Sequence, residues 1–284
     1  MTTVAAMLTE ARARGIALLD AQLLLARILA TPRTALIAHD ERDLTAEESE
    51  RWLGWLARRA AGEPLAYLLG EKEFHGLVLE VNADVLVPRP ETELIVDWAS
   101  SLIAGIARAH AAAGEVRQTT VVDLGTGSGA IALALKRLHP GATVVASDAS
   151  AAALAVARRN ADRTGLAIDF VEGAWWDAVA GRRFDLALAN PPYVAAGDPH
   201  LAALRHEPLI ALSPGGDGLD ALRAIASGSP AHLVAGGWLV VEHGFDQAAA
   251  VRALLTRAGL VEVGTRNDLA GHERATAGRL PGAA

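Results

Sequence analysis

Four consecutive residues, Asn190-Pro191-Pro192-Tyr193, combine groups well suited to holding a small polar substrate. They follow FDLALA at 184–189, an apolar run typical of a buried strand, and α/β sheets bind ligands at strand carboxyl ends. Two prolines fix φ and remove N–H donors, so this NPPY corner is stiff and presents carbonyl oxygens. Two such acceptors can take both hydrogens of an –NH2 group while the Tyr193 ring packs on its plane. That group belongs to adenine, to cytosine or to a side-chain amide; the alternative is a rigid turn that binds nothing.

A second stretch, Val121–Asp148, has the pattern strand, glycine turn, helix, strand and acid. Its glycines allow positive φ and close approach of a ligand, and Asp148 is placed to accept hydrogen bonds from ribose hydroxyls. The spacing lacks the third glycine of the dinucleotide pattern and the lysine of a P-loop. The turn therefore suits a nucleoside with a short amino-acid tail, which is S-adenosylmethionine, although an ordinary turn without a ligand is the alternative. The turn residues are Gly125, Thr126, Gly127, Ser128 and Gly129.

Further candidates lie between and after these motifs. We expect one of the adjacent residues Trp175 and Trp176 to form an aromatic wall against the purine, and the alternative is that one or both only close the core. The irregular stretch 194–216 is long for a compact domain and should cover the site. Its His200 and His206 have no carboxylate cluster at ligand spacing beside them, so we expect no metal.

Alternating strand and helix patterns must position these groups. We expect an α/β fold with a doubly wound, mostly parallel sheet of about seven strands, of which the last two, 260–265 and 273–280, are antiparallel. The glycine turn and the NPPY corner should then face one edge of this sheet. Between them and the N-terminal region, PRPETE at 88–93 has ordinary helix-start chemistry, with a proline near the first position and acids in the first turn.

The N-terminal region has no cluster of catalytic residue types and is predicted to be helical. Asp20 should cap its second helix, and Thr45 with Glu48 should make a capping box at the start of another. Alternation after this region predicts a β-hairpin with its turn at 82–84. The helical region either is a simple bundle or grips a macromolecular substrate. The expected domains are a helical domain at 1–72, a hairpin linker at 73–88 and a larger α/β domain at 89–284.

Composition narrows the classes of function. No stretch of 18 apolar residues occurs without a charge, so we expect no membrane span, and the charged N-terminus does not have the pattern of a signal peptide. The absence of cysteine excludes disulfides, zinc–thiolate clusters and thiol nucleophiles, and fits a cytoplasmic protein. The net charge of -7 argues against a long contact with duplex DNA, which needs a basic face.

Together these motifs resemble those of the class I S-adenosylmethionine-dependent methyltransferases. Within that superfamily, the chain is similar over nearly its full length to the bacterial peptide chain release factor glutamine methyltransferases. The segments that carry the resemblance are LVPRPETE at 86–93, DLGTGSGAIALAL at 123–135, NPPY at 190–193, EPLIAL at 207–212, GGDGL at 215–219 and AGHER at 270–274.

The resemblance implies a Rossmann-like methyltransferase domain and a reaction. S-adenosylmethionine would be held by the glycine turn, Asp148, Trp175 and Asn190. The four residues of the NPPY corner would bind the glutamine of the Gly-Gly-Gln motif in class 1 release factors, with Asn190, Pro191 and Tyr193 acting in catalysis. The helical N-terminal domain would then bind the protein substrate.

Other readings of the sequence stay open. The same chemistry serves a glutamine methyltransferase that acts on a ribosomal protein. An adenine amino-methyltransferase would need a basic face and a target-recognition region, and neither is evident. A non-catalytic cofactor-binding protein would not need an intact NPPY corner. We expect a cytoplasmic monomer with a protein partner and no direct contact with nucleic acid or membrane.

Overall fold

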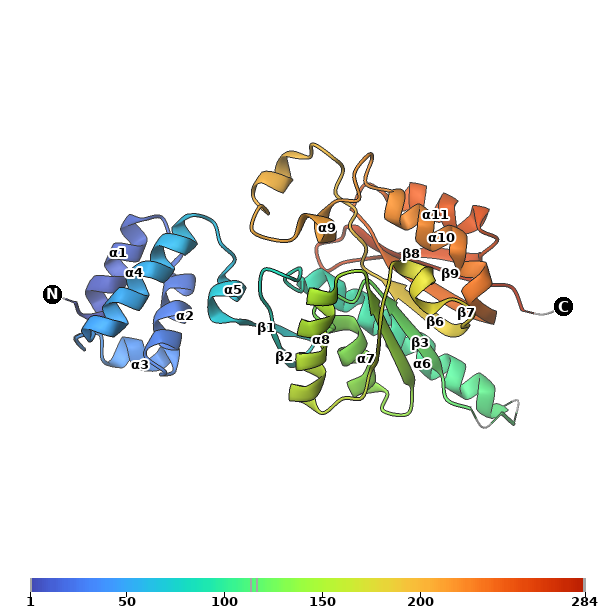
Figure 1. Ribbon diagram of the computed structural model, residues 1–284, viewed down its shortest axis with the longest axis horizontal. Coiled ribbons are helices and arrows are strands. Elements are labelled where there is room, and N and C mark those ends of the chain that lie inside the picture. The colour runs from blue at the N-terminus through green and yellow to red at the C-terminus, as the bar shows by residue number, and fades with distance from the viewer. Residues whose placement is uncertain (1, 113, 116, 283–284) are drawn as a thin grey trace. The chain divides into compact units, whose positions relative to one another are not determined.

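The computed structural model describes residues 2–112, 114–115 and 117–282 (Figure 1). The chain divides into two compact units, with the boundary between Lys72 and Glu73. No helix in the described ranges has the length and apolar character needed to cross a membrane.

The N-terminal unit is a helical bundle with its own apolar core, which includes Leu24, Trp52 and Leu56. The predicted capping box is confirmed: the Thr45 hydroxyl accepts from the Glu48 N–H, and the Glu48 carboxylate accepts from the Thr45 N–H. The expected cap by Asp20 is wrong, because its helix starts earlier and the Asp20 carboxylate pairs with Arg59 instead. The helices are α1 (Val4–Ala13), α2 (Leu18–Ile28), α3 (Arg33–Ala38), α4 (Ala46–Ala60) and α5 (Leu65–Leu69).

The predicted β-hairpin exists but is shorter and lies earlier in the chain. It pairs β1 (Glu71–Phe74) with β2 (Leu77–Glu80). Its turn is at His75 and Gly76, where φ is 49° and 74°, as a tight two-residue hairpin requires. The expected turn at 82–84 forms outside the hairpin, where the Asn82 side chain accepts from the Asp84 N–H. Alternation alone did not distinguish these two turns.

The larger unit is built on a seven-stranded sheet with the order β5-β4-β3-β6-β7-β9-β8. Strands β3 to β7 run parallel, whereas β9 is antiparallel to both β7 and β8. This confirms the doubly wound, mostly parallel sheet and its antiparallel end. The strands are β3 (Thr120–Leu124), β4 (Thr143–Asp148), β5 (Asp169–Glu172), β6 (Phe184–Ala189), β7 (Leu233–Glu242), β8 (Val261–Asn267) and β9 (Glu273–Arg279).

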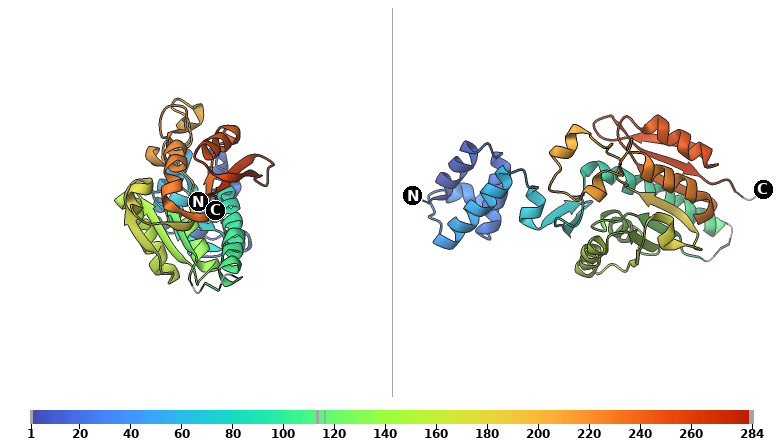
Figure 2. Two further views of the ribbon diagram at one scale, coloured as in Figure 1. Left: turned by 90° about the vertical axis from the view of Figure 1, so that its right-hand side faces the viewer. Right: turned by 45° about the horizontal axis from the view of Figure 1, so that its top comes forward.

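Helices cover both faces of this sheet because alternate side chains of each buried strand point to opposite sides. Val121 packs in one core cluster with α6 and α7, whereas Val122 and Leu124 pack in the other with α10 and α11. Figures 1 and 2 show α10 and α11 together on one side of the sheet and α7 on the other. The longer helices are α6 (Glu93–Ala112), α7 (Ala130–Leu138), α8 (Ala151–Thr164), α10 (Asp220–His232) and α11 (Ala248–Arg257). Shorter turns are η1 (Pro90–Thr92), η2 (Trp175–Val179), η3 (Pro199–Ala202) and α9 (Leu209–Leu212).

Strand register brings the sequence motifs to one edge of the sheet. Leu124 pairs with Ser147 on one side and with Ala189 on the other, and Ala189 pairs with Val241. Because these strands are parallel, the next residue of each one emerges at the same carboxyl edge. Side by side at that edge stand Asp148, Gly125, Asn190 and Glu242.

Candidate active site

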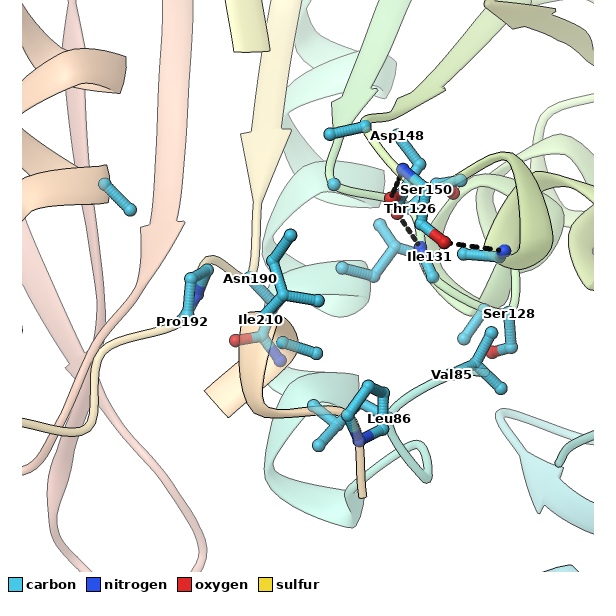
Figure 3. A pocket seen from close by; sticks show the side chains of 18 of the residues that line it. Val85, Leu86, Thr126, Ser128, Ile131, Asp148, Ser150, Asn190, Pro192 and Ile210 are labelled. Atoms are coloured by element: carbon cyan, nitrogen blue, oxygen red, sulfur yellow. Dashed lines mark hydrogen bonds between the residues drawn. The ribbon is translucent and has the colours of Figure 1, made fainter. Parts of the chain in front are cut away.

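A cavity of about 540 Å³ opens at this carboxyl edge. Figure 3 shows Asn190 and Pro192 on one side of it and Asp148, Thr126 and Ser128 on the other. Most of the glycine turn and part of the NPPY corner therefore face one space. Its lining includes Val85, Leu86, Arg89, Thr92, Gly125, Thr126, Gly127, Ser128, Ile131, Asp148, Ser150, Trp175, Asn190, Pro192, Pro208, Ile210, Ala211, Ser213 and Pro214.

The glycine turn forms part of the cavity wall. Gly125 and Gly127 have φ of 75° and 55°, which a side chain would disfavour. The Thr126 hydroxyl donates to Asp123 Oδ2 at 2.6 Å, so a buried carboxyl on β3 stabilises the turn. Burial raises the pKa of Asp123 to about 7. Gly129, with φ of 85°, precedes α7 and is not among the lining residues, so its part in the turn is conformational.

Asp148 is held firmly in the cavity wall. Its Oδ2 accepts from the Gly127 N–H at 2.8 Å, and its Oδ1 accepts from the Ser150 N–H at 2.9 Å. Burial raises the pKa of this carboxyl, although both backbone hydrogen bonds act against that rise. A carboxylate oxygen can accept more than one hydrogen bond, so Asp148 keeps acceptor capacity for hydroxyl groups in the cavity.

The two tryptophans have different environments. Trp176 is buried, donates its indole N–H to the Ile225 carbonyl at 2.8 Å and stacks on His232. Trp175 lines the cavity, and its ring lies so near Gly125 that a Cβ added there would be 3.1 Å from it. The structure thus places Trp175 at the cavity and Trp176 in the core.

The NPPY corner only partly faces the cavity. Asn190 and Pro192 line it, whereas Pro191 is buried and Tyr193 is half-buried, and neither is among the lining residues. Asn190 Nδ2 donates to the Thr92 hydroxyl at 3.0 Å. The Tyr193 hydroxyl donates to Glu242 Oε1 at 3.2 Å. The expected contact between the Tyr193 ring and a bound amide therefore stays a prediction.

The long stretch after NPPY does reach the site. Its last part, from Pro208 to Pro214, contributes to the cavity wall. Glu207, the residue before this part, fixes its position. The buried Glu207 carboxylate accepts from the Val87 N–H at 3.0 Å and is ion-paired with Arg89. The stretch is thus tied to the segment that precedes α6.

Several residues of this environment were not expected from their types or spacing. The PRPETE segment has the chemistry of an ordinary helix start, yet its Arg89 and Thr92 also line the cavity. Arg89 is ion-paired with Glu207, and Thr92 accepts a hydrogen bond from Asn190. Glu242 is also absent from the residues predicted for the site. A signal did exist, because an acid ending an apolar strand, as in WLVVE at 238–242, stands at the edge where ligands bind.

Comparison with known proteins agrees with this architecture. Residues 2–70 match the family model of the PrmC N-terminal domain, and residues 94–217 match that of the methyltransferase small domain. A release factor glutamine methyltransferase of Xylella fastidiosa (strain Temecula1) is 49% identical over 266 residues, with 93% of each chain covered. One of Burkholderia pseudomallei is 49% identical over 280 residues, with 95% of each chain covered.

Solved structures show the same fold at low sequence identity. A methyltransferase of Pyrococcus furiosus matches with a TM-score of 0.53 and 18% identity, covering 83% of this chain and 100% of its own. The N-terminal domain of human METTL16 in complex with SAH matches with a TM-score of 0.52 and 17% identity, covering 84% and 85%. From the extent and identity of the sequence matches, the chain belongs to the release factor glutamine methyltransferase family.

Proposed function

We propose that this chain transfers a methyl group from S-adenosylmethionine to the side-chain amide nitrogen of the glutamine in the Gly-Gly-Gln motif of class 1 release factors. Family membership supports the reaction. The observation that supports this site is that Asn190 and Asp148 line one cavity from neighbouring parts of the same sheet edge. A methyl donor and an acceptor amide can then be bound together, with their reacting atoms close.

The residues of the cavity fit S-adenosylmethionine. Its volume lies within the range of roughly 300–1,000 Å³ typical of small-molecule sites. The anchored Asp148 carboxylate suits the two ribose hydroxyls, the Trp175 ring suits the adenine face, and the turn from Gly125 to Ser128 leaves space for the amino-acid tail. When bound, this cofactor supplies an electrophilic methyl group on a positively charged sulfur.

The NPPY corner would hold the acceptor amide. An amide nitrogen is a poor nucleophile because its lone pair is delocalised into the carbonyl, so positioning is the main task of the site. We assign Asn190 Oδ1 and the Pro191 carbonyl as acceptors for the two amide hydrogens, with Tyr193 packed near the amide plane. These oxygens stabilise the positive charge that the nitrogen gains as it is methylated. The nitrogen then loses one proton to an acceptor or to water, and no dedicated general base is required.

We assign the parts of the chain as a helical substrate-binding domain at 1–72, a linker at 73–88 and a methyltransferase domain at 89–284. A separate helical domain supports recognition of a folded protein rather than of a free amino acid. Release factors act in translation, so we place the enzyme in the cytoplasm, and we propose that it acts as a monomer.

The reaction can be tested with purified protein and labelled S-adenosylmethionine. The candidate substrates are a class 1 release factor, a peptide with its Gly-Gly-Gln motif, ribosomal proteins and an adenine-containing oligonucleotide. Mass spectrometry should find one added methyl group on the glutamine side chain of the release factor. A matched release factor with Glu in place of that Gln is the control and should stay unmodified. Methylation of a ribosomal protein or of the oligonucleotide in its place would refute the proposal.

A further inference from the structure

Glu242 is a buried acid beside the NPPY corner. It ends β7 one position beyond Val241, and Val241 pairs with Ala189, the residue before Asn190. Its side chain is 1% exposed, and its Oε1 accepts from the Tyr193 hydroxyl. Its Oε2 is buried and makes no hydrogen bond of normal geometry among the residues that the structure describes. A carboxyl buried at this position without full pairing needs an explanation beyond packing.

The second neighbour of this carboxyl is Thr92. Thr92 is buried and near enough to Glu242 to lower the pKa of the acid, although the two side chains make no hydrogen bond of normal geometry in the free protein. Such bonds are often long in free enzymes and tighten when substrate binds. Thr92 also accepts from Asn190 Nδ2 at 3.0 Å, so it stands between the acid and the carboxamide.

The donors and acceptors of Glu242, Thr92 and Asn190 fix the direction of the hydrogen bonds along this series of side chains. A hydroxyl carries one hydrogen, and an ionised carboxylate can only accept. If the Thr92 hydrogen is given to Glu242, the Thr92 oxygen must face a donor, which is Nδ2 of Asn190. That orientation turns Asn190 Oδ1 away from Thr92. Without an ionised acid, the hydroxyl can instead donate to Oδ1, and the carboxamide can reverse.

Charges around Glu242 bear on its protonation. Burial raises its pKa to about 7, whereas Thr92, Arg274 on β9 and Tyr193 lower it, and Glu91 on η1 raises it. The Tyr193 pKa is raised, first by burial and then by the negative charge of Glu242, which agrees with a neutral hydroxyl that donates. The acid therefore changes charge close to neutral pH.

We propose that Glu242 is a positioning residue for methyl transfer: through Thr92 it orients the Asn190 carboxamide with Oδ1 toward the substrate, and through Tyr193 it holds the aromatic ring of the corner. This inference rests on the proposed function and adds a residue to it. Glu242 acts without touching the substrate or the cofactor. The Glu242–Thr92–Asn190 chain selects a substrate group that donates hydrogens, such as a primary amide.

The test compares Glu242→Gln, Thr92→Val and their double variant on a class 1 release factor. Each single change should lower kcat about 100-fold, a loss typical of one electrostatic contact in a preorganised site, with cofactor affinity by calorimetry unchanged. The double variant should be no slower than either single variant, because both substitutions interrupt the same series of hydrogen bonds. Thr92→Ser, which keeps the hydroxyl, should recover most of the rate lost in Thr92→Val. Additive losses, or full turnover by Glu242→Gln, would overturn the proposal.

A second readout does not need the substrate. The side-chain amide resonance of Asn190, followed by NMR in the wild type, should shift as pH passes through about 7 because Glu242 ionises there. The shift should vanish in Glu242→Gln and remain in Asp123→Asn, whose carboxyl has a pKa raised to about 7 as well. A shift that persists in Glu242→Gln refutes the inference, even if the variant is slow. A wild type that shows the shift but leaves the release factor unmodified refutes the proposed function instead.

Discussion

Replacing Glu242 by glutamine should stabilise the folded protein above pH 7 while it slows the reaction. Burial raises the pKa of Glu242 from 4.5 to about 7. The folded state therefore binds more protons than the unfolded state between these values. The stability that this group contributes is fully present below pH 4.5 and is lost as pH rises through about 7.

The size of the effect follows from the same two values. A tenfold change in an acid constant is worth about 1.4 kcal/mol, so keeping the carboxylate charged and buried costs the folded state about 3 kcal/mol. Glutamine has nearly the same shape and no charge, so it avoids this cost at high pH. The gain in the free energy of unfolding is at most about 3 kcal/mol, because any hydrogen of the buried NH2 group that finds no acceptor subtracts from it.

The assay is chemical unfolding of wild type and Glu242→Gln at about pH 5 and about pH 8, followed by circular dichroism. The free energy of unfolding should differ more between the two proteins at the higher pH, in favour of the variant. Glu50→Gln, which changes an exposed carboxyl on α4, should follow the wild type at both pH values. A Glu242→Gln variant that is destabilised equally at both pH values would refute the reasoning.

Three further predictions concern the two tryptophans, Asp148 and the NPPY corner. Trp175→Ala should weaken cofactor binding, measured by calorimetry, by roughly 10- to 100-fold because stacking on the adenine is lost. Trp176→Ala should instead lower the free energy of unfolding by about 3–5 kcal/mol, because that ring is buried. Asp148→Ala should weaken cofactor binding by roughly 10- to 100-fold, since it removes a charged acceptor, and unchanged affinity would contradict the ribose assignment. Gly218→Ala should lower kcat and leave cofactor affinity intact, because its Cβ would overlap the Tyr193 carbonyl oxygen and displace the corner; a full rate would show that the corner tolerates the displacement.

Much of the fold could be predicted because its signals are local. Apolar runs such as FDLALA at 184–189 predicted strands that are buried throughout, and Thr45 with Glu48 predicted a helix start that the structure confirms. Alternation could not place the hairpin turn, because two candidate turns lie a few residues apart and the turn at His75 requires a positive φ in a residue other than glycine.

The site was predicted in part for a related reason. Asn190 and Asp148 end strands, and parallel register brings strand ends together. The contacts of Thr92 with Asn190 and of Glu207 with Arg89 join residues about one hundred positions apart, and no periodicity encodes them. The residue types around Thr92 are those expected at a helix start, so the sequence pattern gave no reason to place them in the cavity. Only the packed fold shows that the same residues begin a helix and line the site.

The central claim is that Asn190 holds an amide nitrogen in front of a methyl donor bound at the same sheet edge. Its most direct test is the single-turnover rate of Asn190→Ala on a release factor, measured with saturating S-adenosylmethionine. We predict a loss of at least about 100-fold in that rate, with the cofactor dissociation constant nearly unchanged. A variant that methylates the glutamine at the wild-type rate, or that fails only because it no longer binds the cofactor, would contradict it.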